Sequence, residues 1–270
     1  MNLAFPLAFA LCATSIASAL PANAQCDSAT IERSVQVNTE DWNVAPQYDY
    51  FERDRQPNGG TKTYENLMFL GSPYQRLMAI NGKPLTPDQQ AQEELNWKQT
   101  VAERKKESHR EREQRIAKYE QERKRDHLLL EQMTKALDFQ VVGEKKVGQN
   151  EVCVLKATPR SGFVPTSREA RVLTGMEGTL WIDAKTFQWV KVEANVTHPV
   201  SIEGFLAQVE PGTRFELEKA PVGDNIWLPS HFEMKSQAKI FFFFTRKTQA
   251  NETYYGYHKD LPTEPGAPEN

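Results

Sequence analysis

The residues that most often carry chemistry in enzymes are scattered along this chain. Its five histidines and three cysteines stand in no spacing that is typical of a metal site. There is no His-Glu-x-x-His, no Gly-x-Ser-x-Gly and no phosphate-binding glycine-rich loop ahead of a helix. We therefore expect a non-enzymatic protein without catalytic residues, metal ligands or cofactors; a hydrolase built from scattered histidines and acids is the least favoured alternative. The histidines are His109, His127, His198, His231 and His258.

One group of acids lies beside aromatic residues. Asp49, Glu52 and Asp54 fall in a stretch that also contains two tyrosines and a phenylalanine. Paired carboxylates could act as general acid and base. Acids that alternate along a strand are more often on its solvent-facing side, and we expect that arrangement here.

The first residues are typical of an export signal. Residues 3–20 are apolar, and the sequence PANAQ at 21–25 predicts cleavage after Ala24, which makes 1–24 a signal peptide. The start of the segment departs from the usual signal in having no Lys or Arg. A membrane anchor is the alternative, but the apolar run is short and rich in Ala, Ser and Thr. Cys12 and Cys26 do not follow small residues, so we expect no lipid attachment. The prediction is a periplasmic or secreted protein.

Two cysteines remain after this cleavage. In an oxidising compartment Cys26 and Cys153 could form a disulfide that joins the mature N-terminus to a strand at 151–158. The alternative is a buried Cys153 and an exposed Cys26, both with free thiols.

Alternating apolar and polar residues predict a large antiparallel sheet in the last third of the chain. The clearest runs are 187–196 and 232–240, and shorter ones lie at 177–183, 205–209 and 214–218. Turn-forming sequences separate them at 183–186, 211–212 and 221–225. Upstream, Asn81-Gly82 and the glycines at 59–60 predict hairpins, and 27–44 has the spacing of an amphipathic helix that Asp27 or Ser28 could cap.

A charged helical insertion is predicted at 86–137. Thr86 with Gln89, and Ser108 with Glu111, each have the pattern of a capping box, so we expect two helices with a break near Ser108. Residues 103–115 include no strongly apolar residue and should project into solvent. The insertion could be an arm for a partner or a membrane surface. Because its basic and acidic residues are closely mixed, we favour a solvated helix with interleaved charges.

Two motifs in the sheet region resemble the LolA/LolB-like superfamily of exported bacterial proteins, which includes lipoprotein carriers and the sensor RseB. The sequence GTLWIDAKT at 178–186 with QWVKV at 188–192 looks like the strand–Asp–x–x–Thr turn of that group. The sequence GDNIWLP at 223–229 looks like its later Trp-Leu-Pro strand entry. Two features depart from that group. The charged insertion is larger and more polar than the helical cover of its lipoprotein carriers, and the missing lipid-attachment site distinguishes the chain from its membrane-anchored acceptors.

The resemblance implies an α+β fold, an incomplete antiparallel β-barrel whose concave apolar face is covered by helices and holds acyl chains. We expect a single domain at 25–260 with the insertion at 86–137 and a disordered tail at 261–270. The inward apolar face would be the ligand-binding surface. Its expected residues are Leu180, Ile182, Val190, Val192, Phe215, Leu217, Phe232, Met234 and Ile240.

The resulting hypothesis is non-enzymatic periplasmic binding of a lipid, an acyl chain or a lipoprotein between sheet and helices, as in a carrier. The alternative is an envelope interaction or sensor protein that docks a protein partner through the charged insertion. The formal net charge of −3 gives no reason to expect nucleic acid as a partner. Membrane contact, if any, would be peripheral.

Overall fold

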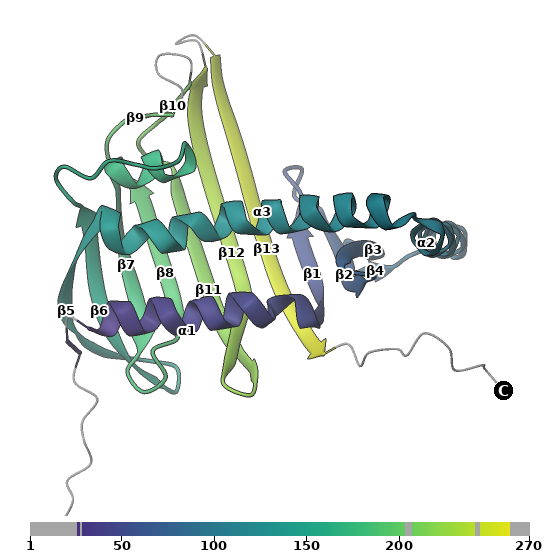
Figure 1. Cartoon of the computed structure of the whole chain (residues 1–270), viewed down its shortest axis with the longest axis horizontal. Helices are drawn as coiled ribbons and strands as arrows, with labels where there is room; N and C mark the ends of the chain where they lie inside the picture. Colours follow the sequence, from purple (N-terminus) through teal and green to yellow (C-terminus); the bar gives the residue numbers. More distant parts are fainter. Residues whose placement is uncertain (1–25, 28, 203–206, 241–243, 260–270) are drawn as a thin grey trace, which may run out of the picture.

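The structure is a computed structural model and describes residues 26–27, 29–202, 207–240 and 244–259. In these residues 13 strands form one antiparallel sheet that is open at both edges (Figure 1). Along the chain the strands are β1 (Tyr48–Arg55), β2 (Thr61–Phe69), β3 (Ser72–Ile80), β4 (Lys83–Pro84), β5 (Leu137–Val147), β6 (Asn150–Pro159), β7 (Met176–Asp183), β8 (Trp189–Val196), β9 (Val200–Ser201), β10 (Ala207–Val209), β11 (Arg214–Gly223), β12 (Ile226–Ile240) and β13 (Phe244–Lys259). The order across the sheet is β4-β3-β2-β1-β13-β12-β11-β8-β7-β6-β5, with β10 pairing to β12 and β9.

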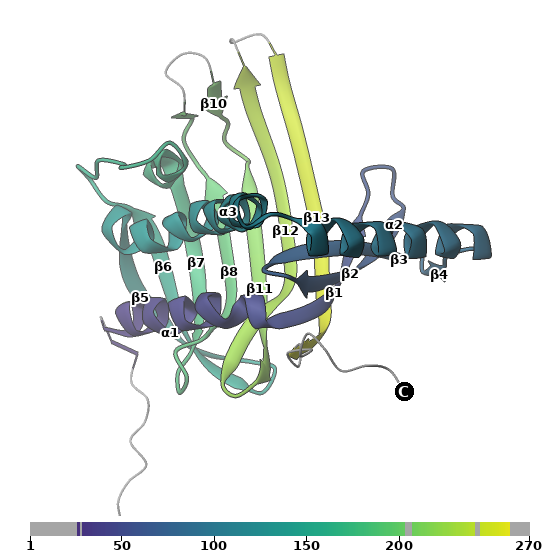
Figure 2. The same cartoon turned by 45° about the vertical axis from the view of Figure 1, so that its right-hand side comes forward.

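This architecture confirms the predicted α+β class built on a large antiparallel sheet. Helix α1 (Thr30–Val44) and the long helix α3 (His109–Ala136) cross the same face of the sheet, as Figures 1 and 2 show from two sides. The remaining helical segments are η1 (Ala45–Gln47), α2 (Pro87–Lys106) and η2 (Glu169–Gly175). The predicted signal peptide at 1–24 and the predicted tail at 261–270 lie outside the described residues.

The hydrophobic core lies between this pair of helices and the strands β5 to β8. Residues from α1, from the C-terminal part of α3 and from η2 pack against the centre of β6 and β7. Leu155, Leu180 and Ile182 are at most 2% exposed. The core is therefore concentrated under one half of the sheet.

Local sequence explains the turns and helix starts. Asn81 and Gly82 connect β3 to β4 with positive φ angles of 53° and 70°, as a tight two-residue hairpin requires. Asp183 Oδ1 accepts the main-chain N–H groups of Lys185 and Thr186 at 3.0 and 2.8 Å, which forms the turn predicted between β7 and β8.

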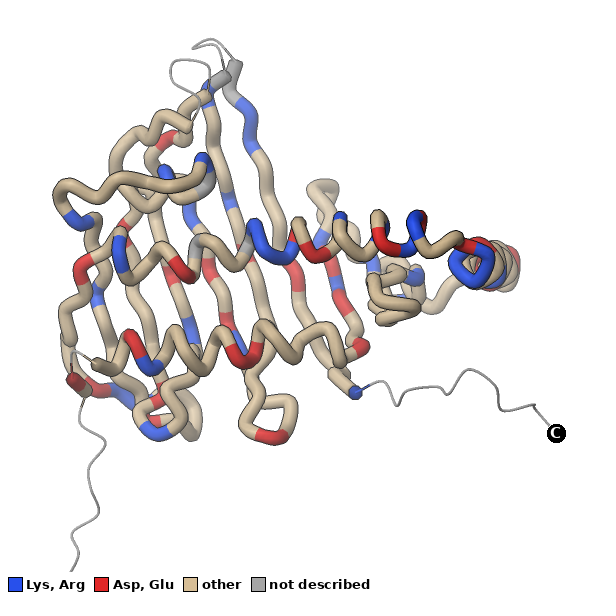
Figure 3. Tube along the Cα trace, in the orientation of Figure 1, with Lys and Arg blue, Asp and Glu red and all other residues tan. Residues whose placement is uncertain are grey.

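Both predicted capping boxes are present. Thr86 caps α2 with Gln89, and Ser108 caps α3 with Glu111; in each pair both reciprocal hydrogen bonds form. The chain therefore breaks between Lys106 and His109, as predicted. Lys, Arg, Asp and Glu are interleaved along both helices (Figure 3), and ion pairs such as Lys98–Glu94 and Arg123–Glu120 join successive turns.

Most residues from 103 to 115 are exposed, as predicted, but Arg104, Glu107 and Arg115 are half-buried and attach the junction of α2 and α3 to the sheet. The Arg104 guanidinium donates to three main-chain carbonyls of residues 69–73 at 2.7 to 2.9 Å. Arg115 donates to the Leu70 carbonyl and the Ser72 hydroxyl, and its 2.7 Å ion pair with Glu107 orients it. Two arginines thus attach the junction to the β2–β3 turn through directional bonds, and the Ile116 side chain lies against Gly71 of the same turn.

The two helices also hold opposite faces of this hairpin. Trp97 of α2 packs against Phe69 and Tyr74, with ring centroids 5.2 and 5.0 Å away. The Tyr119 hydroxyl of α3 lies 3.9 Å from the sulfur of Met68. Because successive strand residues point to opposite faces, Phe69 and Met68 lie on different sides of β2. The β2–β3 hairpin is therefore clasped between α2 and α3.

Candidate functional site

Helix α1 is joined to the sheet by buried polar side chains. Ser34, Asn38 and Asp41 are each at most 5% exposed. The Lys219 ammonium on β11 donates to the Asn38 amide oxygen at 2.6 Å and to Asp41 Oδ2 at 2.7 Å. The Trp189 indole N–H on β8 donates to the Ser34 hydroxyl at 3.1 Å. Directional bonds, as well as apolar packing, therefore position α1.

Asp41 is the centre of this network. Its Oδ1 accepts from the Gln188 amide and from the main-chain N–H of Trp227, both at 3.2 Å. The side chains of Lys219 and Asp41 are only 8% and 3% exposed. Burial lowers the pKa of the Lys219 ammonium, and the Asp41 carboxylate opposes that shift. Removing one partner would leave the other charge buried and unpaired, so the pair has a structural role.

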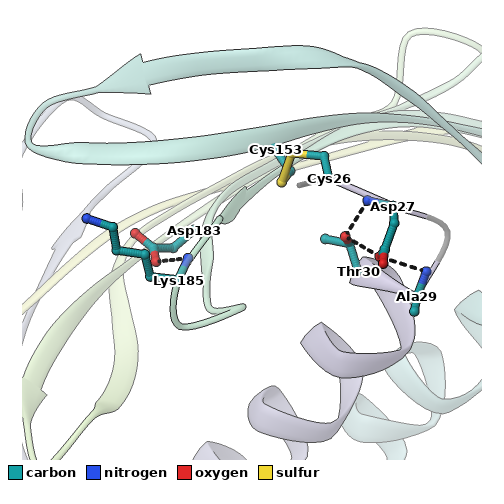
Figure 4. The surroundings of a disulfide bond; sticks show 7 residues. All are labelled: Cys26, Asp27, Ala29, Thr30, Cys153, Asp183 and Lys185. Carbon is teal, nitrogen blue, oxygen red and sulfur yellow. Dashed lines mark hydrogen bonds between the residues drawn. A yellow bond between two sulfur atoms is a disulfide. The ribbon is translucent and has the colours of Figure 1, made fainter. Parts of the chain in front are cut away.

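A disulfide fixes the start of α1. Cys26 and Cys153 are bonded, with their Cα atoms 5.6 Å apart, and this joins the segment before α1 to the middle of β6 (Figure 4). Asp27 then supports the first turn, because its carboxylate accepts from the Ala29 N–H at 3.0 Å and the Thr30 hydroxyl at 3.1 Å. The prediction that Asp27 caps the helix was wrong, because α1 begins at Thr30 after Ala29, which makes no side-chain capping bond; Ser28, the alternative, lies outside the described residues.

An aromatic and cationic stack connects α1 to α3. The Trp42 and His127 rings lie 4.2 Å apart and nearly parallel, and the Arg123 guanidinium is centred 4.3 Å from the Trp42 ring. Arg123 also donates to the Trp42 carbonyl. His127 is 8% exposed, and burial lowers its pKa so that the neutral imidazole is favoured. The stack holds the middle of α3 beside the C-terminal end of α1.

The residues predicted to form the apolar ligand-binding face occupy two environments. Leu180, Ile182 and Val192 belong to the fully buried core under α1 and η2. The other group, which we call the β11–β12 apolar strip, is only half-buried. It consists of Phe215, Leu217, Phe232 and Met234.

The register shows that the strip continues the core across the sheet. Leu155, Leu180, Val192, Leu217 and Phe232 are successive cross-strand neighbours from β6 to β12. The first three are 1%, 2% and 5% exposed, whereas the last two are half-buried. The same face of the sheet is thus sealed at one side and partly open at the other.

Two of the predicted face residues differ from the rest. Val190 lies at a register shift in the β7–β8 pairing, where Ile182 is paired with Trp189. Trp189 is therefore the buried residue at this point, and Val190 is only half-buried, which strict alternation did not predict. Ile240 ends β12 and pairs with Phe244 and Ala207.

The strip ends at a group of tyrosines and glutamates on β13 and β1. Phe232 is paired with Glu252, whose carboxylate accepts from the Tyr254 hydroxyl. Tyr254 is paired with Glu52 on β1. The Tyr50 ring lies 5.9 Å from the ring of Tyr254. We call Tyr50, Glu52, Glu252, Tyr254 and Tyr257 the tyrosine–glutamate cluster.

The cluster is partly removed from water. Burial, reinforced by the nearby Glu252 carboxylate, raises the pKa of Glu52, although the Asn66 and Gln75 amides donate to its Oε2. Burial also raises the pKa of Tyr50, so its phenol stays neutral. Two carboxylates at the end of an apolar strip give this end of the face a polar and anionic character.

The interpretation of the acids on β1 as a solvent-facing row was wrong for two of them. Asp49 is 6% exposed, and its carboxylate accepts the Met68 N–H at 2.6 Å. Glu52 points to the helix-covered face with Tyr50. Nothing in the local alternation distinguishes such acids, because their partners lie on distant strands: Met68 on β2 for Asp49, and Asn66 and Gln75 on β2 and β3 for Glu52.

Groups for metal chemistry are absent from the described part of the chain, where no three His, Cys, Asp or Glu residues are placed to hold an ion together. Within the same residues, none of the helices combines the length and the apolar character that crossing a membrane requires.

No protein-family model and no curated protein matches the chain. Among solved structures it is similar to an outer membrane lipoprotein-sorting protein domain from Vibrio parahaemolyticus, with 10% identity, coverage of 87% of this chain and 95% of that one, and a TM-score of 0.31. A DUF1329 family protein from Desulfovibrio piger is 9% identical, with coverage of 87% and 94% and a TM-score of 0.33. The MucA/MucB complex of Pseudomonas aeruginosa gives 10% identity, coverage of 82% and 93%, and a TM-score of 0.21.

TM-scores of 0.33 or less at about 10% identity are too low to transfer a function. The chain is similar to these lipoprotein-sorting, DUF1329 and MucB structures, and its own geometry must indicate what it does.

Proposed function

We propose that this protein is a non-enzymatic binder of an acyl chain, presented by a lipid or by an acylated protein, and acts as a carrier in the periplasm. The observation that carries the proposal is the β11–β12 apolar strip. Its four large apolar side chains lie on the helix-covered face and continue the core, yet they remain half-buried. Apolar surface that the helices leave partly exposed is where a ligand chain gains from leaving water.

The energetics suit a ligand held without catalytic groups. Each CH₂ group transferred from water to an apolar site contributes roughly 0.8 kcal/mol. A dozen such groups would contribute roughly 10 kcal/mol before the costs of association are subtracted. Backbone motion is not required at the strip itself, because the row from Val192 to Phe232 is already in place.

Helix α3 is the proposed cover of the bound chain. Its C-terminal part is anchored in the core through Met133 and Ala136, and its N-terminal part is attached to the β2–β3 turn. Between these anchors most of its described residues from 121 to 125 are exposed. To admit a ligand, the segment of α3 between the two anchors would have to shift, and this would break the stack of Arg123 and His127 on Trp42.

The proposed compartment is consistent with the cysteines. A disulfide between Cys26 and Cys153 persists in an oxidising compartment such as the periplasm and is rare in the cytosol. Together with the predicted cleavage after Ala24, this supports export of a mature single domain that begins at Gln25.

The proposal is tested by placing a charge on the strip. Met234→Asp should weaken binding of a fluorescent fatty acid by about tenfold or more, because a carboxylate in the apolar site is poorly solvated. Gln249→Asp is the matched control. Gln249 is adjacent in sequence to Ala250, the cross-strand partner of Met234, but it is exposed on the opposite face of the sheet, beside Lys235. If both variants fold and bind the fatty acid with equal affinity, the β11–β12 apolar strip is not the ligand-binding surface. Val192 is less suitable because it is 5% exposed, so a charge there would damage the core.

The alternative function, docking of an envelope protein through the charged helices, is favoured by one observation. Helix α2 has no buried residue along its 20 residues. Deleting 98–124 would not test it cleanly, because the deletion also removes Arg104, Arg115 and Tyr119, which hold the β2–β3 hairpin. Point substitutions on α2 are the better test.

A further inference from the structure

A groove separates strand β3 from the first half of α2, away from the face that α1 and α3 cover. Its cavity volume is about 480 Å³. Residues 76–78 of β3 form one wall, Leu85 lies in it, and residues 87–94 of α2 form the other wall. The size is in the range of sites that hold small ligands or a short peptide segment, and too small for a folded domain.

The strand in this groove is an edge strand. On its outer side β3 is paired with β4 at only two positions, Ala79 and Ile80. From Ser72 to Met78 the described strands give β3 no partner on that side. A strand edge presents main-chain N–H and C=O groups in a row, which is the template on which an extended peptide adds.

One main-chain N–H group on this edge makes only a weak hydrogen bond, to a side chain instead of a neighbouring strand. The Leu77 N–H points into the groove and is accepted by Glu93 Oε2 at 3.4 Å. That distance is long for a hydrogen bond, so a strand carbonyl at the usual ~2.9 Å would replace it with better geometry. Gln75 precedes Leu77 by two residues, and its main-chain N–H and C=O therefore face the same side.

The charges of the groove favour a basic occupant. Its one lining cation, Arg76, is already shared between Glu94 at 3.1 Å and Glu65 at 3.9 Å. Glu93 has no salt bridge with any cation of the described chain, although its carboxylate also receives a long bond from Asn96. A Lys or Arg side chain beside Glu93 would neutralise this carboxylate.

The remaining lining of the groove is apolar. Neighbouring side chains of α2 limit how much of the β3 edge an added strand could contact. Leu85 is 6% exposed, and Leu77 and Met78 are half-buried around it. Further along the same edge, Trp97 and Arg104 of α2 already cover the β2–β3 turn. An added strand would therefore contact only the part of β3 from about Gln75 to Met78.

We infer that this groove docks a short extended segment of a partner protein, which adds as a strand to the edge of β3 and places a Lys or Arg beside Glu93. The site is separate from the β11–β12 apolar strip and goes beyond the proposed function. It assigns the partner chemistry: an apolar and basic peptide in extended conformation, recognised mainly through its main chain.

The test uses the full chain, purified after export, and three labelled heptapeptides in fluorescence anisotropy. An alternating Val/Lys peptide should bind saturably, an alternating Val/Glu peptide should bind about tenfold more weakly or not at all, and a Val/Lys peptide with a central Pro should bind weakly. Glu93→Lys should weaken the first peptide by about tenfold. Glu103→Lys is the matched control, because Glu103 is exposed on the same helix outside the groove.

Amide hydrogen exchange distinguishes an added strand from mere charge attraction. The Val/Lys peptide should slow exchange at Gln75 and Leu77, and the slowing should be lost in Glu93→Lys. Equal binding of the Val/Glu peptide, an equal effect of Glu103→Lys, or protection elsewhere without change at Leu77 would overturn the inference. A dimer in native mass spectrometry that Glu93→Lys dissociates would assign the groove to a second copy of this chain and would also overturn it.

Discussion

Helices α1 and α3 cross the same face of the sheet but are attached to it in different ways. α1 has 15 residues, and its buried positions are mainly polar side chains that bond to the sheet, with a disulfide at its start. α3 has 28 residues and is attached at three places: by core packing near its C-terminus, by the stack of Arg123 and His127 on Trp42 in its middle, and by the β2–β3 turn near its N-terminus. Under the proposed function, α1 would be part of the scaffold and α3 would be the cover of the bound chain.

The largest effect should come from the buried ion pair of α1. Asp41→Ala leaves Lys219 without its carboxylate in a site that is 8% exposed, and should lower the free energy of unfolding by roughly 3–5 kcal/mol. Chemical denaturation measures this. Glu40→Ala, at the adjacent exposed position, is the control and should change the value by less than about 0.5 kcal/mol. A loss below about 1 kcal/mol for Asp41→Ala would contradict the scaffold role of α1.

Reduction of the disulfide should also weaken α1 specifically. Loss of the Cys26–Cys153 bond is expected to lower the free energy of unfolding by about 2–5 kcal/mol, through greater freedom of the unfolded chain. Denaturation with and without reductant gives the difference. Thiol titration in denaturant without reductant should find no free thiol in the mature chain; two free thiols would show that the bond is not made.

The attachment of α3 should be weaker and more local. Arg115→Ala removes the bonds to Leu70 and Ser72 and should cost about 1–2 kcal/mol, seen mainly as faster amide exchange in β2 and β3. Arg110→Ala, on an exposed turn of the same helix, should leave that exchange unchanged. Equal protection of β2 and β3 from exchange in both variants would mean that Arg115 does not hold the β2–β3 hairpin.

The smallest expected effect concerns pH and the tyrosine–glutamate cluster. The pKa of Glu52 is raised in the folded state, so its stabilising contribution is present below the unfolded pKa and is lost as the pH rises through the folded value. Glu52→Gln should therefore stabilise the fold at pH 7, by up to about 1 kcal/mol because the site is partly screened, and do so less at pH 4. Thermal unfolding at both values measures the difference. A variant that is less stable than the native chain at pH 7 would contradict this sign.

Local patterns predicted the elements well where the chain's own neighbours determine structure. The capping boxes at Thr86 and Ser108 and the Asn81-Gly82 hairpin depend on residues within a few positions of each other. Alternation also placed 232–240 in a strand, although β12 begins earlier, at Ile226. These signals are readable because side chain and backbone partner lie in one short segment.

Hydrogen bonds and ion pairs between distant residues could not be predicted, whereas the Cys26–Cys153 disulfide was one of two alternatives because residue type and export suggested it. Asp41 meets Lys219 across 178 residues of sequence, and Arg115 meets the Leu70 carbonyl across 45. Residue type alone places Arg104 and Arg115 on a solvated helix, and only the fold brings the carbonyls of the turn to them. Likewise, alternation identifies the apolar face but not which part of it the helices leave half-covered, since coverage depends on where α3 crosses.

Native mass spectrometry of the protein purified from its exported compartment tests the central claim most directly. A stoichiometric adduct that is lost on denaturation, and that solvent extraction identifies as an acyl lipid or acylated peptide, is the result expected. Met234→Asp should lack the adduct and Gln249→Asp should keep it. A clean mass for the native chain, with no uptake of added phospholipid or lipopeptide, would contradict acyl binding and leave the β3–α2 groove as the surface to pursue.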